Sequence, residues 1–150
     1  MRIHTFTLGP FLTNSYVIED EGTGMAMLVD PTIGSETIYD AIMARRLTIG
    51  LIVNTHGHVD HVYGNAFFKE KTGAELAIHG DDAVWLRSIP QQALMFGIGA
   101  PASPAADRLL TDGDTVALNG LCFRVIHTPG HTPGGICLYG HGILISGDTL

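Results

Sequence analysis

Three short apolar segments of this chain each run directly into a glycine-containing turn that carries histidine or aspartate. "GLIVNT" leads into "HGHVDH", "CFRVIHT" leads into "PGHTPGG", and "ILIS" leads into "GDT". Apolar runs of this length predict buried strands. If the strands are neighbours, their turns lie along one edge of the fold, where a rigid sheet can hold several polar side chains at one site.

The first turn has the densest group of potential metal ligands, which are His56, His58, Asp60 and His61. The spacing of His56 and His58, with Gly57 between them, suits a turn that directs two imidazoles toward one point. Asp60 and His61 then point toward a second point nearby. Imidazole and carboxylate groups bind zinc, iron and manganese. The alternative is a polar surface loop, which the buried strand immediately before the cluster disfavours.

His131 and Asp148 follow the other two strands. Each alone would be an ordinary turn residue. Together with the first cluster, they are predicted to be further ligands of a metal centre. His127 precedes the His131 turn, and we expect it to orient that turn without binding the metal itself.

The remaining pattern predicts a mixed α/β (α+β) fold of layered sheets with helices outside. Residues 90–107 are rich in proline, glycine and alanine and predict a long surface loop. This loop either lines a substrate site through Met95 and Phe96 or is an insertion without function. The predicted helices are 35–47, which Ser35 would cap, 63–71 and 81–88, and the predicted strands are 2–8, 14–20, 25–30, 50–55, 74–80, 114–120, 122–128, 136–140 and 143–146.

Composition limits the class of protein further. The 150 residues are 45% hydrophobic and 15% charged, which favours one folded domain over a disordered chain. The net charge is −7 and the basic residues are scattered, which disfavours nucleic acid as a partner. No apolar run approaches the roughly 20 residues that a membrane helix needs. The first residues lack the layout of a secretory signal, so we expect a cytoplasmic protein.

Three motifs, "THGHVDHVYGN", "HTPGHTPGGICLY" and "SGDTL", together resemble the metallo-β-lactamase superfamily, and within it the compact single-domain relatives of glyoxalase II. The resemblance covers nearly the whole chain. It implies an αββα sandwich with metals at one edge between the sheets. It further implies a residue assignment in which a first metal is held by His56, His58 and His131, a second by Asp60 and His61, and Asp148 bridges the two.

The chain departs from this family after "GDTL", where family members continue and supply one more histidine to the second metal. We therefore expect a fold that is incomplete at its C-terminus. We also expect one tightly bound zinc and a second, weaker one, with iron or manganese as possible substitutes. Exposed apolar surface near the C-terminal edge predicts either self-association or a piece of a longer protein.

By resemblance, the expected activity is metal-dependent hydrolysis of thioesters such as S-2-hydroxyacylglutathione, so the partner is a small molecule. Asp60 and Asp148 would be the catalytic carboxylates, acting as metal ligands. A persulfide dioxygenase with a single iron on His56, His131 and Asp148 is the first alternative. The second is a metal-binding domain without activity.

Overall fold

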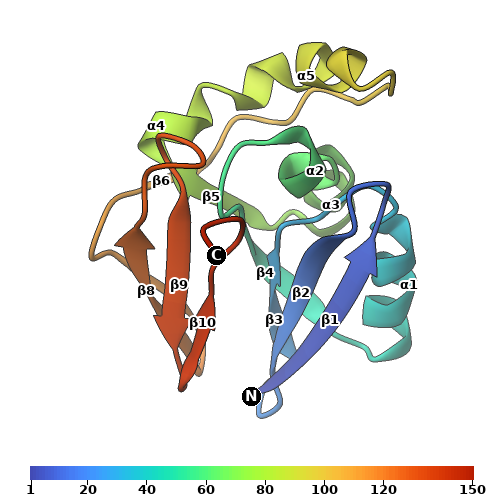
Figure 1. The fold of residues 1–150 in the computed structure, drawn as a ribbon. Helices are drawn as coiled ribbons and strands as arrows, with labels where there is room; N and C mark the ends of the chain where they lie inside the picture. The colour runs from blue at the N-terminus through green and yellow to red at the C-terminus, as the bar shows by residue number, and fades with distance from the viewer.

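Two β-sheets lie face to face in the computed structural model, which describes residues 1–150 (Figure 1). In the first sheet, β1 to β3 are antiparallel and β3 to β6 are parallel. The second sheet is antiparallel throughout. The spatial order of the first sheet is β1 (Arg2–Leu8), β2 (Thr13–Asp20), β3 (Met25–Val29), β4 (Thr48–Val53), β5 (Glu75–His79) and β6 (Arg108–Leu110), and that of the second is β10 (Ile143–Ile145), β9 (Ile136–Gly140), β8 (Leu121–His127) and β7 (Thr115–Leu118).

The parallel strands are joined by helical connections, as parallel pairing requires. These helices lie outside the first sheet and across the end of the fold that is uppermost in Figure 1. In chain order they are α1 (Glu36–Ala44), α2 (Val59–Val62), α3 (Asn65–Thr72), α4 (Gly80–Ala83), the 3₁₀ turn η1 (Leu86–Ser88) and α5 (Ile89–Met95).

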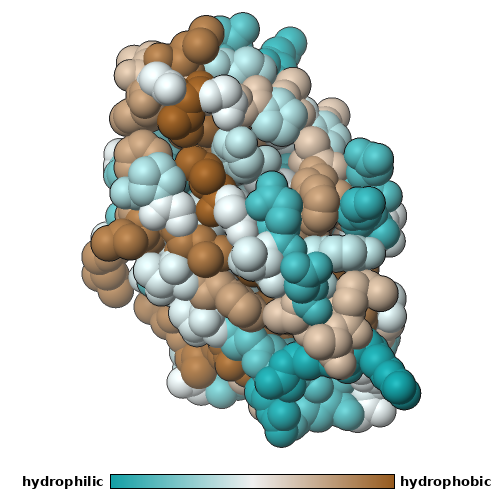
Figure 2. Space-filling model, turned by 90° about the vertical axis from the view of Figure 1, so that its right-hand side faces the viewer, coloured by the Kyte–Doolittle hydropathy of each residue, from teal (hydrophilic) through white to brown (hydrophobic).

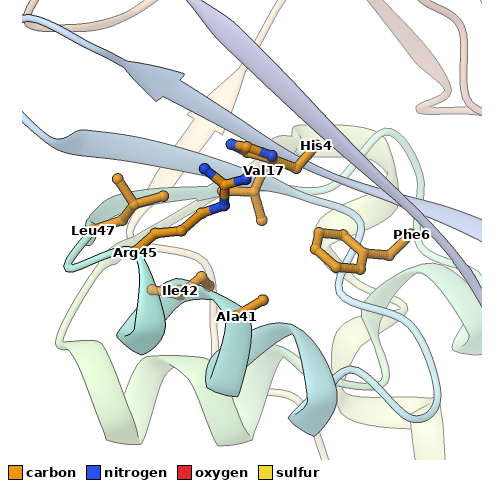
Figure 3. Close-up of a pocket in the computed structure, with 7 residues that line it drawn as sticks. All are labelled: His4, Phe6, Val17, Ala41, Ile42, Arg45 and Leu47. Atoms are coloured by element: carbon orange, nitrogen blue, oxygen red, sulfur yellow. The ribbon is translucent and has the colours of Figure 1, made fainter.

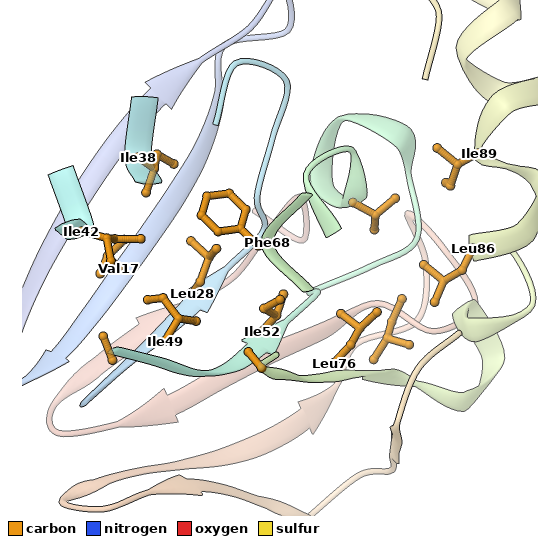
Figure 4. Packing of buried hydrophobic residues seen from close by; sticks show 14 of the residues in the cluster. Val17, Leu28, Ile38, Ile42, Ile49, Ile52, Phe68, Leu76, Leu86 and Ile89 are labelled. Atoms are coloured by element: carbon orange, nitrogen blue, oxygen red, sulfur yellow. The ribbon is translucent and has the colours of Figure 1, made fainter. Parts of the chain in front are cut away.

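Strands β3 to β5 of the first sheet are covered on both faces, which explains why they are nearly continuous apolar runs. On the helix side, Ile38 and Ile42 of α1 and Phe68 of α3 pack in one core cluster with Leu28 and Ile52 of the sheet (Figure 4). The other face packs against the second sheet in a separate cluster.

The second sheet buries only one face. Along β8, Leu121, Phe123 and Val125 are buried between the sheets, whereas the alternate residues Cys122 and Arg124 are exposed. This alternation is typical of an antiparallel sheet with one solvated face. The helix, sheet and sheet layers confirm the predicted metallo-β-lactamase type of fold.

Several predicted boundaries were wrong. Ser35 precedes α1, but its side chain makes no capping hydrogen bond. The predicted helix 81–88 is divided between α4 and η1. The predicted loop 90–107 begins inside α5, because Pro90 lies in the first turn of that helix, where a missing backbone N–H costs nothing. The short strand β6 was not predicted.

The surface is chemically mixed. On the face shown in Figure 2, a band of apolar side chains runs beside strongly hydrophilic ones. Every helix in the structure is too short or too polar to cross a membrane.

A narrow cavity lies between α1 and the first two strands, where His4, Phe6 and Arg45 face one another (Figure 3). Its volume is only about 10 Å³. That is room for no more than one water molecule, so this cavity is not a substrate site.

Candidate metal centre

The three predicted turns do meet, but their strands are not neighbours in one sheet. β4 belongs to the first sheet, whereas β8 and β10 belong to the second. The turns converge because the two sheets face each other and all three turns lie at the same end. A backbone hydrogen bond from Ile136 N to Thr55 O, 2.9 Å long, joins the two sheets beside the site.

His56, His58 and His131 form the first ligand group. One nitrogen from each ring lies within 4.8 Å of the others. The ring centroids are 4.7 to 4.9 Å apart and the rings are nearly perpendicular, so they surround a common point instead of stacking. Three imidazoles arranged in this way match the donor set of a zinc site.

Asp60 and His61, the residues expected to hold a second cation, form the second ligand group. The ligand atom of His61 also lies within 4.8 Å of those of His56 and Asp148. His61 Nε2 lies 3.4 Å from Asp60 Oδ2. Thr13, at the start of β2, donates a hydrogen bond of 2.7 Å to Asp60 Oδ2 and holds this carboxylate in place. Asp60 and His61 lie in the short helix α2, which begins immediately after His58.

The Asp148 carboxylate lies between the two groups. Its Oδ2 is 3.3 Å from His131 Nε2 and 3.8 Å from His56 Nε2. Its Oδ1 is 3.2 Å from His61 Nε2. One oxygen therefore faces the first ligand group and the other faces the second, which is the arrangement that a bridging ligand needs.

Asp30, which sequence reasoning missed, supports both groups from behind. Its Oδ2 accepts from His61 Nδ1 at 2.9 Å and from Thr55 Oγ1 at 2.6 Å. Because the Thr55 hydroxyl donates to Asp30, its oxygen accepts from His56 Nδ1, which lies 3.1 Å away. Both rings are thereby held with Nε2 directed toward the site, a common way of orienting metal-binding histidines.

Asp82 was also missed. It is fully buried in α4, and its carboxylate accepts from Gly57 N at 2.9 Å, Thr132 Oγ1 at 2.7 Å and Gly134 N at 2.7 Å. These partners lie beside the histidines of the first ligand group. The only sequence signals were the run of acidic residues at 81–82 and the glycines of the two loops.

Burial and nearby charges shift the pKa values of the imidazoles in opposite directions. Burial, together with the neighbouring His61, lowers the pKa of His56 to about 4. Burial and the nearby His131 also lower the pKa of His58. Burial alone would lower the pKa of His61, but the charge and hydrogen bond of Asp30, with the charges of Asp60 and Asp148, outweigh it and raise the pKa to about 9. Three carboxylates thus favour positive charge at this position.

The fit to a metal is also visible in an unpaired atom. His56 Nε2 is buried and has no hydrogen-bond partner, although its ring is otherwise held in place. An unpaired buried nitrogen is costly unless something binds it. The donor set, three imidazoles with a shared carboxylate, matches zinc and other first-row divalent cations.

A further cluster, His79, Asp81 and His127, has the residue types of a metal site but not the geometry. The two imidazoles stack with centroids 4.1 Å apart and planes 15° apart, so their in-plane lone pairs run parallel and do not converge. Instead, His127 Nε2 hydrogen-bonds to Pro133 O at 2.8 Å. His127 therefore supports the turn that carries His131, as expected.

A cavity of about 350 Å³ opens beside the histidines. His58, Asp60, His131 and Asp148 line its polar side, and Phe11, Val59 and Phe96 line its apolar side. Phe11 and Phe96 meet edge to face with centroids 5.0 Å apart. Of the two residues expected at a substrate site, Phe96 lines this cavity, whereas Met95 is 84% exposed and does not.

Residues 8–150 match the metallo-β-lactamase superfamily, and the chain belongs to that superfamily. Within it, the chain is 31% identical to the hydroxyacylglutathione hydrolase GloC of Haemophilus influenzae, over 100% of this chain and 72% of that protein. Several other curated hydroxyacylglutathione hydrolases are matched over about half of their length, between 46% and 51%.

Solved structures agree with this assignment. The fold is similar to that of BLEG-1, a B3 metallo-β-lactamase, with a TM-score of 0.90 and 28% identity over 99% of this chain and 73% of that one. It is also similar to TTHA1623 in a di-iron-bound form, with a TM-score of 0.80 and 30% identity over 91% of this chain and 66% of that one.

Proposed function

We propose that this chain is a metal-dependent hydrolase of thioesters, with S-2-hydroxyacylglutathione or a similar compound as substrate. The observation that carries the proposal is the position of Asp148, whose two oxygens face separate ligand groups 3.2 to 3.8 Å away. This position suits a two-cation centre. The similarity to hydroxyacylglutathione hydrolases supports the choice of thioesters.

His56, His58 and His131 would hold one cation, Asp60 and His61 the other, and Asp148 both. Divalent cations bound there would polarise a carbonyl group and lower the pKa of water enough to supply a nucleophile at neutral pH. Asp60 would act as a ligand, since Thr13 donates to its Oδ2 at 2.7 Å and holds the carboxylate beside His61.

The cavity beside the centre would position the substrate. Its polar side, formed by the ligand residues, would face the thioester carbonyl. Its apolar side would contact an apolar part of the substrate through Phe11, Val59 and Phe96. Gln92 holds the apolar side of the cavity against the turn that carries His56 and His58, because it accepts from Val59 N at 3.1 Å and donates to Gly57 O at 3.2 Å.

The direct test is a thiol-release assay on S-2-hydroxyacylglutathione with zinc-loaded protein. We expect hydrolysis that a chelator abolishes and added zinc restores. His58→Ala is expected to lose activity, whereas His141→Ala, an exposed histidine outside the site, should keep it. A fully metal-loaded protein that hydrolyses no thioester would contradict the proposal and favour a metal-binding domain without activity.

A second candidate is oxidation of a persulfide by a single iron. Asp148 Oδ2 lies within 3.8 Å of Nε2 of both His56 and His131, so these three residues also form a compact two-histidine, one-carboxylate set. The di-iron form of TTHA1623 shows that a protein of similar fold binds iron. Stoichiometric iron after aerobic purification, with oxygen uptake on glutathione persulfide, would favour this candidate over hydrolysis.

A further inference from the structure

Asp82 lies behind the first ligand group and contacts both of the loops that carry it. Its side chain is fully buried in α4, and no cation lies within ion-pair distance of its carboxylate. Instead, Oδ2 accepts from Gly57 N at 2.9 Å and from Thr132 Oγ1 at 2.7 Å, and Oδ1 accepts from Gly134 N at 2.7 Å. A buried carboxylate is stable only when its oxygens are satisfied in this way.

The three donors stand next to the three imidazoles. Gly57 is the residue between His56 and His58, and Thr132 directly follows His131. The two loops are about 75 residues apart in the chain and come from opposite sheets, so their relative position depends on contacts such as these. One carboxylate therefore fixes the distance between the His56–His58 turn and the His131 turn.

Gly134 approaches α4 too closely to carry a side chain, and Gly57 leaves little room for one. A Cβ added at Gly134 would lie 2.6 Å from Asp82 N and 2.7 Å from Asp82 Oδ1. A Cβ at Gly57 would lie 3.1 Å from Asp82 O and 3.2 Å from Trp85 Cβ. The glycines and the aspartate thus form one close-packed, hydrogen-bonded contact.

The chemistry of the contact requires a carboxylate. All three partners donate, so all three must meet an acceptor. A carboxamide offers one oxygen and one NH₂ group. In asparagine, therefore, at least one partner would face another donor in a buried position, which costs more than a simple lost hydrogen bond.

Asp82 and Asp30 support the ligand groups in different ways, and Asp30 reaches the first group only through Thr55, which contacts His56. Asp82 contacts only the loops of His56, His58 and His131, whereas Asp30 contacts the ring of His61 directly at 2.9 Å. We propose that Asp82 is a positioning residue that sets the affinity of the first ligand group for its metal without contacting the metal. This inference rests on the metal centre of the proposed function and not on the choice of substrate.

The test compares zinc binding by wild type, Asp82→Asn and Asp81→Asn in competition with a chromophoric chelator. Asp81 is the matched control because it precedes Asp82 in α4 but has a side chain that is 61% exposed. We expect Asp82→Asn to weaken the tight zinc by about 10- to 100-fold, the usual effect of losing an outer-shell partner, and Asp81→Asn to leave it unchanged. The weaker second zinc should change less than the first.

Thr132→Val removes one of the three hydrogen bonds with little change in shape. It should weaken binding of the tight zinc by a smaller factor than Asp82→Asn does. If Asp82→Asn fails to fold, Thr132→Val tests the role of this contact in its place. A second readout needs no metal: amide hydrogen exchange at Gly57 and Gly134 of the metal-free protein should be faster in Asp82→Asn than in wild type.

Wild-type zinc affinity in a folded Asp82→Asn variant would overturn this inference and leave the proposed function intact. If Asp82→Asn does not fold, wild-type zinc affinity in Thr132→Val has the same meaning. The opposite result is also distinguishable. If Asp82→Asn weakens zinc binding but the wild-type protein hydrolyses no thioester, only the proposed function fails. A wild-type protein without a tight zinc site would contradict both.

Discussion

At the level of single residues, the carboxylate of Asp148 connects the two ligand groups. Its side chain is 43% exposed, and it faces imidazoles from both sheets. Replacement by alanine removes an oxygen from each cation site at once. We expect Asp148→Ala to lose more affinity and activity than the roughly 10- to 100-fold that an outer-shell change typically costs. Zinc content after dialysis and the rate of thiol release measure the two effects.

The control for this variant is Asp40→Ala, which removes an exposed carboxylate of α1 outside the site. It should keep wild-type zinc content and turnover. Full turnover in Asp148→Ala would show that the cations do not share this residue.

Asp30 offers a complementary prediction for the second ligand group. Asp30→Asn replaces the oxygen that faces His61 Nδ1 or the one that accepts from Thr55 N, 2.7 Å away. The second zinc should weaken by about 10- to 100-fold, because the orientation of His61 is lost. Competition titration of both ions measures this effect. The first zinc should weaken less, because Asp30 reaches His56 only through Thr55. A larger loss at the first site than at the second would contradict this prediction.

The six candidate ligands could be predicted from the sequence because each follows a recognisable local pattern, an apolar strand and a glycine turn. The supporting carboxylates could not. Asp82 is 25 residues from Gly57 and 52 from Gly134, so its partners become evident only when the chain has folded. Asp30 likewise ends an ordinary apolar strand, and its contacts with Thr55 and His61 are 25 and 31 residues away.

At the level of elements, α5 ends at the apolar side of the cavity beside the metal centre, because Phe96, which lines that side, directly follows the helix. Its composition predicted a loop, but packing of Ile89 and Ala93 into the helix-side core stabilises a helix there. Such tertiary contacts decide whether a segment rich in proline and alanine folds into a helix, and local helix propensity does not take them into account.

The role of the apolar side of the cavity is tested by Phe96→Ala. The substitution removes an aromatic pair with Phe11, an interaction of about 0.5–1.5 kcal/mol. We expect kcat/KM for a thioester with an apolar acyl group to fall by about two- to tenfold, with zinc content unchanged. Leu94→Ala is the control, because Leu94 is 73% exposed on the same helix and does not line the cavity. Equal effects of the two substitutions would exclude a specific contact.

Asp20 connects the ends of two hairpins, one from each sheet. A hydrogen bond from Gly120 N, with others from Thr23 and Gly22, lowers the pKa of Asp20 below its ordinary 3.8. A carboxyl group with a lowered folded pKa stabilises the protein at pH values above its ordinary pKa, and this contribution is lost as the pH falls through the folded pKa. The difference in Tm between wild type and Asp20→Asn should therefore be largest near neutral pH and shrink in acid. A difference that is constant with pH would contradict this account.

At the level of the whole molecule, two sheets of different character create one site. The pattern of strands and turns predicted that the ligands meet, but it treated their strands as neighbours. The family resemblance, not this pattern, implied a site between two sheets. The two-sheet arrangement has a functional consequence, because small shifts between the sheets would separate His131 and Asp148 from His56 and His61.

Self-association remains a prediction. β10 is the edge strand of the second sheet, and Leu144 in β10 is 48% exposed beside Tyr139 in β9, which is 52% exposed. Strand edges with exposed apolar side chains tend to pair with other chains. Size-exclusion chromatography with light scattering should give a dimer or larger species, and Leu144→Lys should shift it toward monomer. A monomeric wild-type chain at all concentrations would contradict this expectation.

Equilibrium dialysis of the metal-free chain against zinc shows whether the six candidate ligands form two cation sites. The first ligand group provides three imidazoles and the second only one, with carboxylates for the rest. We predict one tight zinc per chain and a second, weaker one that both require Asp148. Less than one zinc per chain at saturation, or binding that Asp148→Ala leaves unchanged, would contradict a two-cation site bridged by Asp148.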